Sequence, residues 1–466
     1  MEVKMDIPNL TQHLKTSKNI YFIGIGGIGM SALAKYFLGL GYKVAGYDKT
    51  LSNITKSLSA FGAQISDLDS PNSIPNGFLN LDNTLVVYTP AITKDNAIFN
   101  YLQKFGFELF KRSEILGEIS RNNFCFAVSG THGKTTTSTM LGHILHDNDV
   151  EATSFLGGIS ENYNTNLIKG KANVCVVEAD EFDKSFLKLS PNIACITSTD
   201  ADHLDIYGDK NAVEKSFLDF SELVSETVFV KKGINIKGKT FAINESADFM
   251  AQNIRIENST YVFDVTTPKE TLDDVTLEMP GEHNVLNALA AIAMANTYGI
   301  SLPNIAKSLK SFKGIKRRFS YKIKSDNLIL IDDYAHHPTE INALYKAVSS
   351  LYPDENILAV FQLHLYSRTR DFEEAFVQSL SQFDKLLLLP IYPAREKPIE
   401  GVSSQNLIKK IKNIKGAKTD DFKLVVESEL TKEITASNAK VIVFIGAGDI
   451  GVMVEKVTEE LKNKLL

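Results

Sequence analysis

Short apolar runs recur along the chain, and glycine-rich or charged stretches follow most of them. Runs rich in Val, Ile and Leu, without polar alternation, predict strands that are buried on both faces. Such runs lie at 19–23, 42–48, 85–88, 124–128, 173–177, 192–196, 328–331, 357–361, 385–389 and 441–445. The segments at 30–41 and 288–299 have the composition of helices. This alternation predicts an α/β protein with mainly parallel sheets.

The runs fall into three groups, and a chain of 466 residues has room for about three domains of typical size. We expect a Rossmann-like N-terminal domain over residues 1–112 and a central, P-loop ATPase-like domain with a mainly parallel sheet over 113–315. A C-terminal Rossmann-like α/β domain is expected over 316–466. The stretch 314–319, GIKRRF, is interpreted as the hinge region that leads into this third domain.

The run at 124–128 leads into a glycine-rich turn and then into small, helix-compatible residues. The turn reads Ser129-Gly130-Thr131-His132-Gly133-Lys134-Thr135. A strand that breaks at glycines and restarts as a helix aims backbone N–H groups and the helix dipole at a phosphate. Lys134 adds an ammonium, and the Thr135 hydroxyl can ligate the magnesium of a nucleotide. Val128 replaces the first glycine of the usual P-loop, so a particular subfamily of ATP users, or a plain glycine-rich turn, is indicated.

A second glycine-rich turn, Gly24-Ile25-Gly26-Gly27-Ile28-Gly29, follows the first predicted strand. Backbone without side chains can approach a diphosphate closely, and Asp48 at the end of the next strand can accept hydrogen bonds from ribose hydroxyls. The pattern alone also fits a nicotinamide dehydrogenase or a turn that serves packing only. It therefore predicts a nucleotide diphosphate site without naming the nucleotide.

Two carboxylate-rich loops follow the runs at 173–177 and 192–196. Their residues are Glu178-Ala179-Asp180-Glu181-Phe182-Asp183 and Asp200-Ala201-Asp202-His203-Leu204-Asp205. The carboxyl ends of parallel strands meet at one sheet edge, so we expect both loops beside the phosphate-binding turn. Carboxylate oxygens suit magnesium, and His203 is a candidate ligand to a second ion. Either loop taken alone also fits a solvated surface.

Composition narrows the classes of function. A net charge of −6 argues against a broad nucleic-acid footprint. Cys125, Cys175 and Cys195 stand singly in apolar runs, which predicts buried thiols in a reducing compartment. The first residues lack an apolar signal core, and no window approaches the roughly 20 apolar residues of a membrane span. We therefore expect a cytoplasmic protein without membrane insertion.

Ten motifs, taken in order, resemble the Mur ligases, the ATP-dependent amino-acid ligases of peptidoglycan precursor synthesis. The motifs are FIGIGGIGMSALA, AVSGTHGKTTT, VVEADEFDKSF, DADHLDIY, GEHNVLNALAA, GIKRRF, DDYAHHPTEI, FQLHLYSRTRD, YPAREKPIEGV and GAGDI. The resemblance implies that L-alanine is joined to the lactoyl carboxylate of UDP-N-acetylmuramate through an acyl phosphate, with ATP and Mg2+. We expect a monomer or a weak homodimer that binds no nucleic acid.

The resemblance also implies roles for single residues. ATP would be bound by Gly130, Thr131, His132, Gly133, Lys134, Thr135, Thr136, Asn287, Arg318 and Asp333. The metal ions would be held by Thr135, Glu178 and His203. The UDP-sugar would contact Gly24, Gly26, Gly27, Gly29, Asp48, Thr89 and Ala91. The catalytic residues would be Lys134, His337, His364 and Arg368. His364, Arg368 and either His337 or His336 would lie near the muramoyl carboxylate and the amino acid. His337 or His364 would accept the proton of the amine.

Three positions depart from the family pattern. Ser198 stands where asparagine is common, Leu363 replaces a frequent proline, and Leu365 replaces an arginine of some members. Three alternatives stay open at this point. One is the related recycling ligase, which joins a tripeptide to the same UDP-sugar. The others are a folylpolyglutamate synthase, which lacks the first glycine-rich domain, and a UDP-sugar-binding module without catalysis, which leaves the metal carboxylates unexplained.

Overall fold

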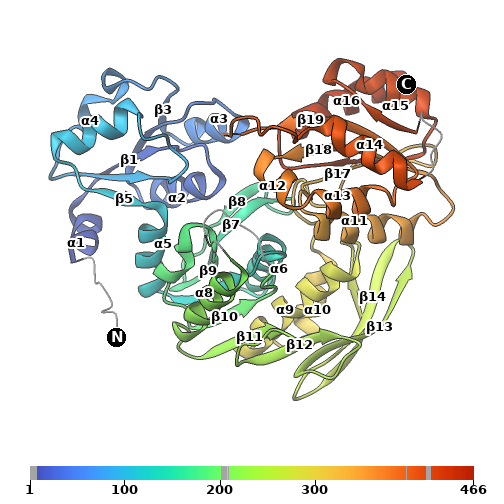
Figure 1. The fold of residues 1–466 in the computed structure, drawn as a ribbon. Helices are drawn as coiled ribbons and strands as arrows, with labels where there is room; N and C mark the ends of the chain where they lie inside the picture. Colours follow the sequence, from blue (N-terminus) through green and yellow to red (C-terminus); the bar gives the residue numbers. More distant parts are fainter. Residues whose placement is uncertain (1–7, 201–206, 208, 395, 416–420, 466) are drawn as a thin grey trace. The chain divides into compact units, whose positions relative to one another are not determined.

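The computed structural model describes residues 8–200, 207, 209–394, 396–415 and 421–465. They form two compact units, which are treated separately below (Figure 1). The first unit comprises Met1–Gln252, Asp264–Val275 and Leu286–Phe312. The second unit comprises Asn253–Phe263, Thr276–Val285 and Lys313–Leu466.

The first unit begins with a five-stranded parallel sheet of order β3-β2-β1-β4-β5. Its strands are β1 (Asn19–Ile23), β2 (Lys43–Tyr47), β3 (Gln64–Ser66), β4 (Thr84–Tyr88) and β5 (Leu109–Lys111). Its helices are α1 (Pro8–Thr16), α2 (Ile28–Gly39), α3 (Asn53–Ala60) and α4 (Ala97–Phe105). Alternate residues of β1 pack into two different apolar clusters, so both faces of the sheet are covered.

A ten-stranded sheet follows, in the order β15-β14-β13-β12-β11-β10-β6-β9-β7-β8. Its strands are β6 (Phe124–Ser129), β7 (Thr153–Ser160), β8 (Thr165–Ile168), β9 (Val174–Glu178), β10 (Ile193–Ile196), β11 (Thr227–Lys231), β12 (Lys239–Ile243), β13 (Phe249–Glu257), β14 (Thr260–Thr266) and β15 (Thr271–Leu277). The pairs from β13 to β7 are parallel, and β8 is antiparallel to β7. The associated helices are α5 (Arg112–Arg121), α6 (Lys134–Asp147), η3 (Phe182–Lys188), α8 (Lys210–Glu222), α9 (Glu282–Tyr298) and α10 (Leu302–Lys310).

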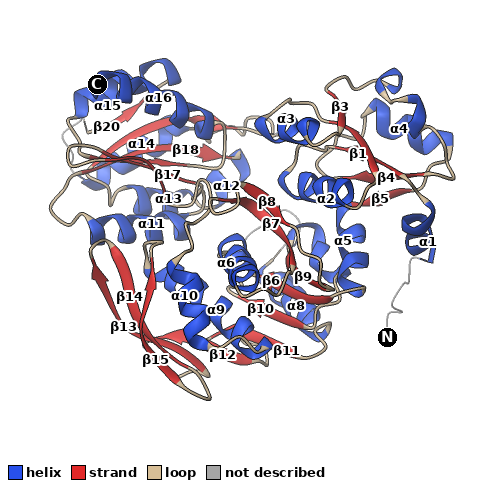
Figure 2. Ribbon diagram, turned by 180° about the vertical axis from the view of Figure 1, so that it is seen from behind, coloured by secondary structure: helices blue, strands red, loops and turns tan. Residues whose placement is uncertain are grey.

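The second unit contains a six-stranded sheet of order β16-β17-β21-β18-β19-β20, drawn with its strands in red in Figure 2. The strands are β16 (Ser320–Lys324), β17 (Ile329–Asp333), β18 (Ile357–His364), β19 (Lys385–Tyr392), β20 (Phe422–Leu424) and β21 (Val441–Ile445). Only β16 pairs in an antiparallel way among these described strands. The helices are α11 (Pro338–Leu351), α12 (Tyr366–Asp371), α13 (Glu373–Leu380), α14 (Ser404–Lys415), α15 (Leu430–Ser437) and α16 (Ile450–Leu465).

The predicted α/β class and the mainly parallel central sheet are confirmed. Each apolar run expected to be a strand overlaps a strand of the structure. Within the first unit, one apolar cluster extends from the first sheet into the second, and Lys35 of α2 donates to Asn166 of β8 at 2.9 Å. The proposed boundary near residue 112 therefore does not separate two independent cores, and the domain ranges stay a prediction.

The three cysteines are buried, as expected, and Cys125 on β6 lies opposite Cys175 on the neighbouring strand β9. In the part of the chain that the structure describes, no helix is both long and apolar enough to cross a membrane.

Candidate active site

The phosphate-binding turn joins β6 to α6, and two of its glycines have a backbone that requires glycine. Gly130 has φ +131° and Gly133, which precedes α6, has φ +85°. Ordinary side chains rarely adopt these angles. A Cβ atom on Gly133 would also clash with the side-chain oxygen of Asn287 on α9. The fold therefore brings Asn287 to the predicted ATP loop, as the sequence suggested.

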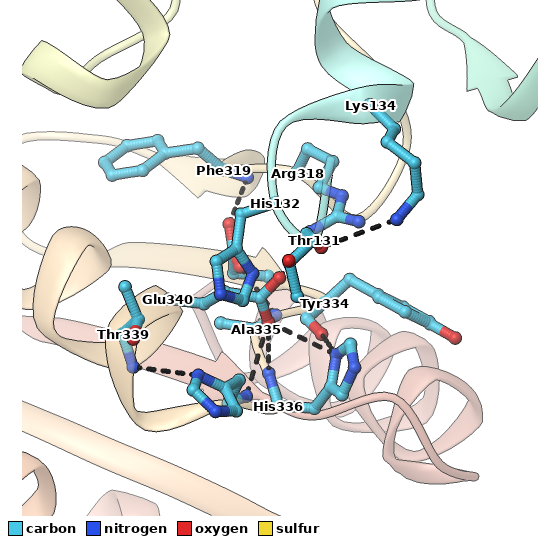
Figure 3. Close-up of polar contacts among 12 residues, drawn as sticks. Thr131, His132, Lys134, Arg318, Phe319, Tyr334, Ala335, His336, Thr339 and Glu340 are labelled. Carbon is cyan, nitrogen blue, oxygen red and sulfur yellow. Dashed lines mark hydrogen bonds and ion pairs between the residues drawn. The ribbon is translucent and has the colours of Figure 1, made fainter. Parts of the chain in front are cut away.

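Lys134, the lysine of the turn, is buried beside an acidic residue. Its Nζ donates to the Gly130 carbonyl oxygen at 2.7 Å and to both carboxylate oxygens of Glu181 at 2.8 Å. Burial lowers the pKa of Lys134, but the carboxylates of Glu181, Asp180 and Glu178 outweigh it and raise the pKa above its ordinary value. The lysine thus keeps its positive charge inside the loop. Figure 3 shows its ammonium turned toward the backbone of the turn at Thr131.

The loop after β10 supports the same turn. The Thr197 hydroxyl donates to the carbonyl oxygens of Ser129, at 3.1 Å, and of His132. Ser198 accepts from the backbone N–H of His132 through its hydroxyl at 2.8 Å and from that of Thr131 through its carbonyl at 3.2 Å. Ser198, which replaces the family's common asparagine, therefore holds the backbone of the phosphate-binding turn directly.

Two of the three predicted magnesium ligands, Glu178 and Thr135, lie at the same sheet edge. Glu178 ends β9 and pairs with Val128 of β6, next to the turn. Its carboxylate lies against Gly157 of β7, where a Cβ atom would clash with it. Thr135 is nearly buried in the first turn of α6. A carboxylate and a hydroxyl are hard oxygen donors that fit magnesium. His203, the third predicted ligand, lies outside the described residues.

Among the described residues, no group of three His, Cys, Asp or Glu side chains could hold a metal ion by itself. A magnesium ion at Thr135 and Glu178 would therefore need further oxygen ligands, and the phosphates of a nucleotide have such oxygens.

The first glycine-rich turn contacts the segments predicted to lie near it. A Cβ atom on Gly24, whose φ is +86°, would lie 2.5 Å from the Thr89 methyl carbon. Asp48 accepts from the backbone N–H of Gly26 at 2.7 Å, so its carboxylate is bound to the turn itself. The Arg112 guanidinium lies against Gly29 and is 3.6 Å from Asp180. Arg112 is not among the site residues that the sequence predicts.

In the second unit, Asp333 at the end of β17 orders two neighbouring segments. Its two carboxylate oxygens accept from the backbone N–H groups of Phe319, at 2.7 Å, and Ala335, at 2.8 Å. Burial raises the pKa of Asp333, and the nearby Arg318 opposes this shift. Arg318 lies over the ring of Tyr334, 5.1 Å from its centre. Asp333 and Arg318, both predicted to contact ATP, are thus neighbours in the fold.

The histidines of this unit separate into two environments. The His336 ring lies 6.2 Å from that of His364, and the Nδ1 atom of His364 is 3.5 Å from Arg368 Nη1. His337 instead accepts from the backbone N–H of Thr339 at the start of α11, and its ring packs on Phe372. Burial lowers the pKa of His336, which favours a neutral imidazole near pH 7. The structure therefore brings His336, His364 and Arg368 together.

Three family models match consecutive parts of the chain. The one described as "Mur ligase family, catalytic domain" matches residues 19–124. That of the "Mur ligase middle domain" matches residues 128–295, and that of the "Mur ligase, glutamate ligase domain" matches residues 317–448. Together they cover most of the 466 residues, including the three groups of predicted site residues.

Similar proteins are known over the full length of the chain. A UDP-N-acetylmuramate–L-alanine ligase from Christiangramia forsetii is 54% identical over 96% of this chain and 98% of its own. The crystal structure of a UDP-N-acetylmuramate–alanine ligase from Thermotoga maritima matches with a TM-score of 0.83 and 29% identity, over 96% of this chain and 99% of that one. The crystal structure of a murein peptide ligase from Psychrobacter arcticus matches over 96% of this chain and 99% of that one, with a TM-score of 0.68 and 24% identity, and therefore shares the fold.

Proposed function

The chain belongs to the Mur ligase family, and we propose that it uses ATP to join L-alanine to UDP-N-acetylmuramate in the synthesis of peptidoglycan precursors. The observation that carries this proposal is the full-length identity to the alanine ligase of Christiangramia forsetii. The phosphate-binding turn with its charged Lys134 supports the use of ATP. The tripeptide-joining recycling ligase is not favoured, because relatives at 52–54% identity are alanine ligases and the solved alanine ligase matches with a higher TM-score, 0.83, than the murein peptide ligase, 0.68.

The reaction begins with an oxygen of the lactoyl carboxylate attacking the γ-phosphorus of ATP, and ADP leaves. The product is an acyl phosphate, whose carbonyl carbon is then attacked by the amine of L-alanine. The tetrahedral intermediate expels phosphate, and the nitrogen loses its proton to a base. Lys134 supplies a fixed positive charge where the phosphoryl group moves, together with the backbone N–H groups of the turn.

We assign the nucleotide to the turn from Gly130 to Thr136 and to Asn287, because Asn287 lies directly over Gly133. Arg318 and Asp333 of the second unit are proposed as further ATP contacts. Thr135 and Glu178 would hold Mg2+, with His203 as a ligand to a second ion. When bound, such ions neutralise negative charge on the phosphates.

The UDP-sugar is assigned to the Gly24–Gly29 turn, with Asp48, Thr89 and Ala91 beside it. The contact between Gly24 and Thr89 supports this grouping. The bond from Gly26 N–H to Asp48 holds that carboxylate at the turn, close to where a ribose or diphosphate would lie.

For the amine's proton we propose His364 rather than His337, because His364 lies with His336 and Arg368 in one group, whereas the His337 ring packs on Phe372. Arg368, beside His364, is a cation suited to a substrate carboxylate. His336 lies next to this pair and is proposed to face the muramoyl carboxylate.

We further propose that the protein works in the cytoplasm as a monomer or a weak homodimer, in three domains. The buried cysteine thiols agree with a reducing compartment. Each of the three sheets draws its strands from one of the proposed domain ranges, which supports that division.

Phosphate release from ATP, measured with Mg2+ and UDP-N-acetylmuramate, tests the function. L-alanine, other amino acids and the tripeptide are added in separate reactions, and the products are weighed by mass spectrometry. We expect release that needs both the UDP-sugar and L-alanine, with an alanyl adduct. Turnover with the tripeptide only would assign the protein to the recycling ligases instead.

A further inference from the structure

Glu396 belongs to the motif YPAREKPIEGV, none of whose residues has a role in the reaction described above. It lies in the loop after β19, and its carboxylate reaches the first turn of α12. One carboxylate oxygen accepts from the backbone N–H of Ser367 at 3.0 Å, and the other accepts from the Ser367 hydroxyl. Glu396 therefore fixes the start of α12 from a separate part of the chain.

The segment that Glu396 holds carries two proposed active-site residues. His364 ends β18, and Arg368 lies in α12. Between them, Leu365 has φ +73° and ψ 137°, a conformation that non-glycine residues rarely adopt. Such a backbone persists only where the surrounding structure holds it in place. The turn from His364 to Arg368 thus depends on outside contacts.

Tyr392 and Glu396 supply these contacts at three points. The Tyr392 carbonyl oxygen accepts from the backbone N–H of Leu365 at 3.0 Å. The Tyr392 ring stacks on His364, with ring centres 5.7 Å apart and an interplanar angle of 21°. Glu396 adds the third point through Ser367. One short segment therefore fixes the backbone on both sides of the strained Leu365.

The charge of Glu396 suits this position. Burial raises the pKa of Glu396, but hydrogen bonds from Ser367 and Tyr366 and the nearby His364 lower it below its ordinary value. The residue is therefore a carboxylate at neutral pH. A carboxylate that accepts backbone N–H bonds at the start of a helix forms charge-assisted bonds and interacts favourably with the helix dipole.

We propose that Glu396 is a positioning residue, which holds the turn from His364 to Arg368 in the geometry that receives the amino acid. The inference rests on the proposed function, since that function places His364 and Arg368 beside L-alanine and the muramoyl carboxylate. In this proposal Glu396 acts through the backbone and hydroxyl of Ser367, to which its carboxylate is bonded.

Steady-state kinetics of Glu396→Gln test the proposal. Glutamine has nearly the same shape but lacks the charge and one of the two acceptor oxygens. Since a small displacement of reacting groups has a large effect on rate, we expect roughly a tenfold to hundredfold loss in kcat/KM for L-alanine. The KM for ATP should stay within about twofold, because the phosphate-binding turn lies in the other unit and the bonds of Glu396 go to Ser367, not to Arg318 or Asp333.

Two further variants separate positioning from a general loss of stability. Glu373→Gln removes a carboxylate at the start of the neighbouring helix α13, where Glu373 is bonded to Lys410 at 2.7 Å, and should leave the kinetics unchanged. Ser367→Ala should weaken the use of L-alanine less than Glu396→Gln, and the two effects should not add in the double variant. The proposal would be overturned if Glu396→Gln lowered kcat/KM equally for ATP, UDP-N-acetylmuramate and L-alanine. It would also be overturned if the losses of Glu396→Gln and Ser367→Ala added in the double variant.

Amide hydrogen exchange gives a readout that does not depend on the reaction. In Glu396→Gln, the amides of residues 364–369 should exchange faster than in the wild type, while those of β17 stay protected. Unchanged amide exchange in Glu396→Gln would contradict the role of Glu396. So would unchanged kinetics of Glu396→Gln, provided that the wild-type protein makes the alanyl adduct. If the wild-type protein makes no alanyl adduct but the amides of Glu396→Gln exchange faster, the proposed function alone is contradicted.

Discussion

Lys134 makes its closest polar contacts with Glu181 and with the carbonyl oxygen of Gly130. Its ammonium is the fixed charge that the phosphates would meet, and the UDP-sugar turn is a separate part of the fold. We therefore expect Lys134→Ala to abolish phosphate release while leaving UDP-N-acetylmuramate binding, measured by calorimetry, within about twofold of the wild type. Loss of sugar binding as well would contradict the division between the two sites.

His143 on α6 gives a prediction about pH. Its Nδ1 atom is 2.7 Å from the Tyr163 hydroxyl, and its Nε2 atom is 2.9 Å from the Ser308 carbonyl oxygen. A neutral imidazole satisfies both contacts. Burial lowers the pKa of His143 below its ordinary 6.5, although Asp147 and Ser308 oppose the shift. His143 therefore takes up a proton more readily in the unfolded chain than in the folded chain. As the pH falls through about 6.5, the free energy of unfolding decreases.

The corresponding variant is His143→Gln. Between pH 7.5 and pH 5.5 the wild type should lose unfolding free energy through this residue that the variant does not lose, up to the limit of about 1.4 kcal/mol that an unfolded pKa of 6.5 sets. Urea unfolding at the two pH values measures it. His13→Gln, which changes a partly exposed histidine of the separate helix α1, is the control, because His146 packs against Tyr163 and affects the pKa of His143. A pH dependence in His143→Gln that equals that of the control would contradict the prediction.

At this scale, the sequence predicts site residues from their spacing, but it does not identify residues whose role depends on orientation. Lys134 and Glu178 follow directly from a glycine-rich turn and a strand end. The acidic stretch 178–183 contains four carboxylates, and the sequence does not say which one turns toward the lysine. The structure shows that Glu181 does. The same limit applies to Glu396, whose partner Ser367 is 29 positions away.

At the scale of elements, the strand β10 and its loop hold the phosphate-binding turn. Thr197 is buried and donates to two carbonyl oxygens of that turn. Thr197→Val keeps the shape of the side chain and leaves these acceptors without this donor. We expect a loss of about 1–3 kcal/mol in unfolding free energy and a higher KM for ATP.

Urea unfolding and ATP kinetics check this prediction. Thr435→Val changes an exposed threonine of α15 with a comparable hydroxyl-to-carbonyl bond and should alter neither quantity. If Thr197→Val lowers stability without raising the KM for ATP, β10 supports the fold but does not set the geometry of the turn.

The sequence predicts strands correctly where a strand is buried on both faces and its residues form a continuous apolar run. The core strands β1, β6, β18 and β21 are continuous apolar runs because helices or neighbouring segments cover both faces of their sheets. Strands such as β13 and β15 mix exposed polar and buried apolar residues, so no continuous apolar run marks them. Short strands such as β3 and β5 give too few residues for a pattern.

At the scale of the whole molecule, the proposed machinery is divided between two units. The phosphate-binding turn, Asn287 and the UDP-sugar turn belong to the first unit, and Arg318, Asp333, His364 and Arg368 belong to the second. Sequence order predicted three groups of functional residues, because loops after parallel strands gather at one edge of each sheet. It also predicted that one reaction would use all of them.

The central claim is that the chain forms an alanyl adduct through an acyl phosphate. The most direct test supplies UDP-N-acetylmuramate labelled with ¹⁸O in its lactoyl carboxylate, with ATP, Mg2+ and L-alanine, and weighs both products. Since a carboxylate oxygen bridges to phosphorus and leaves with it, we predict the alanyl adduct together with phosphate that carries one ¹⁸O. No adduct with L-alanine, or an adduct accompanied by unlabelled phosphate, would contradict the account.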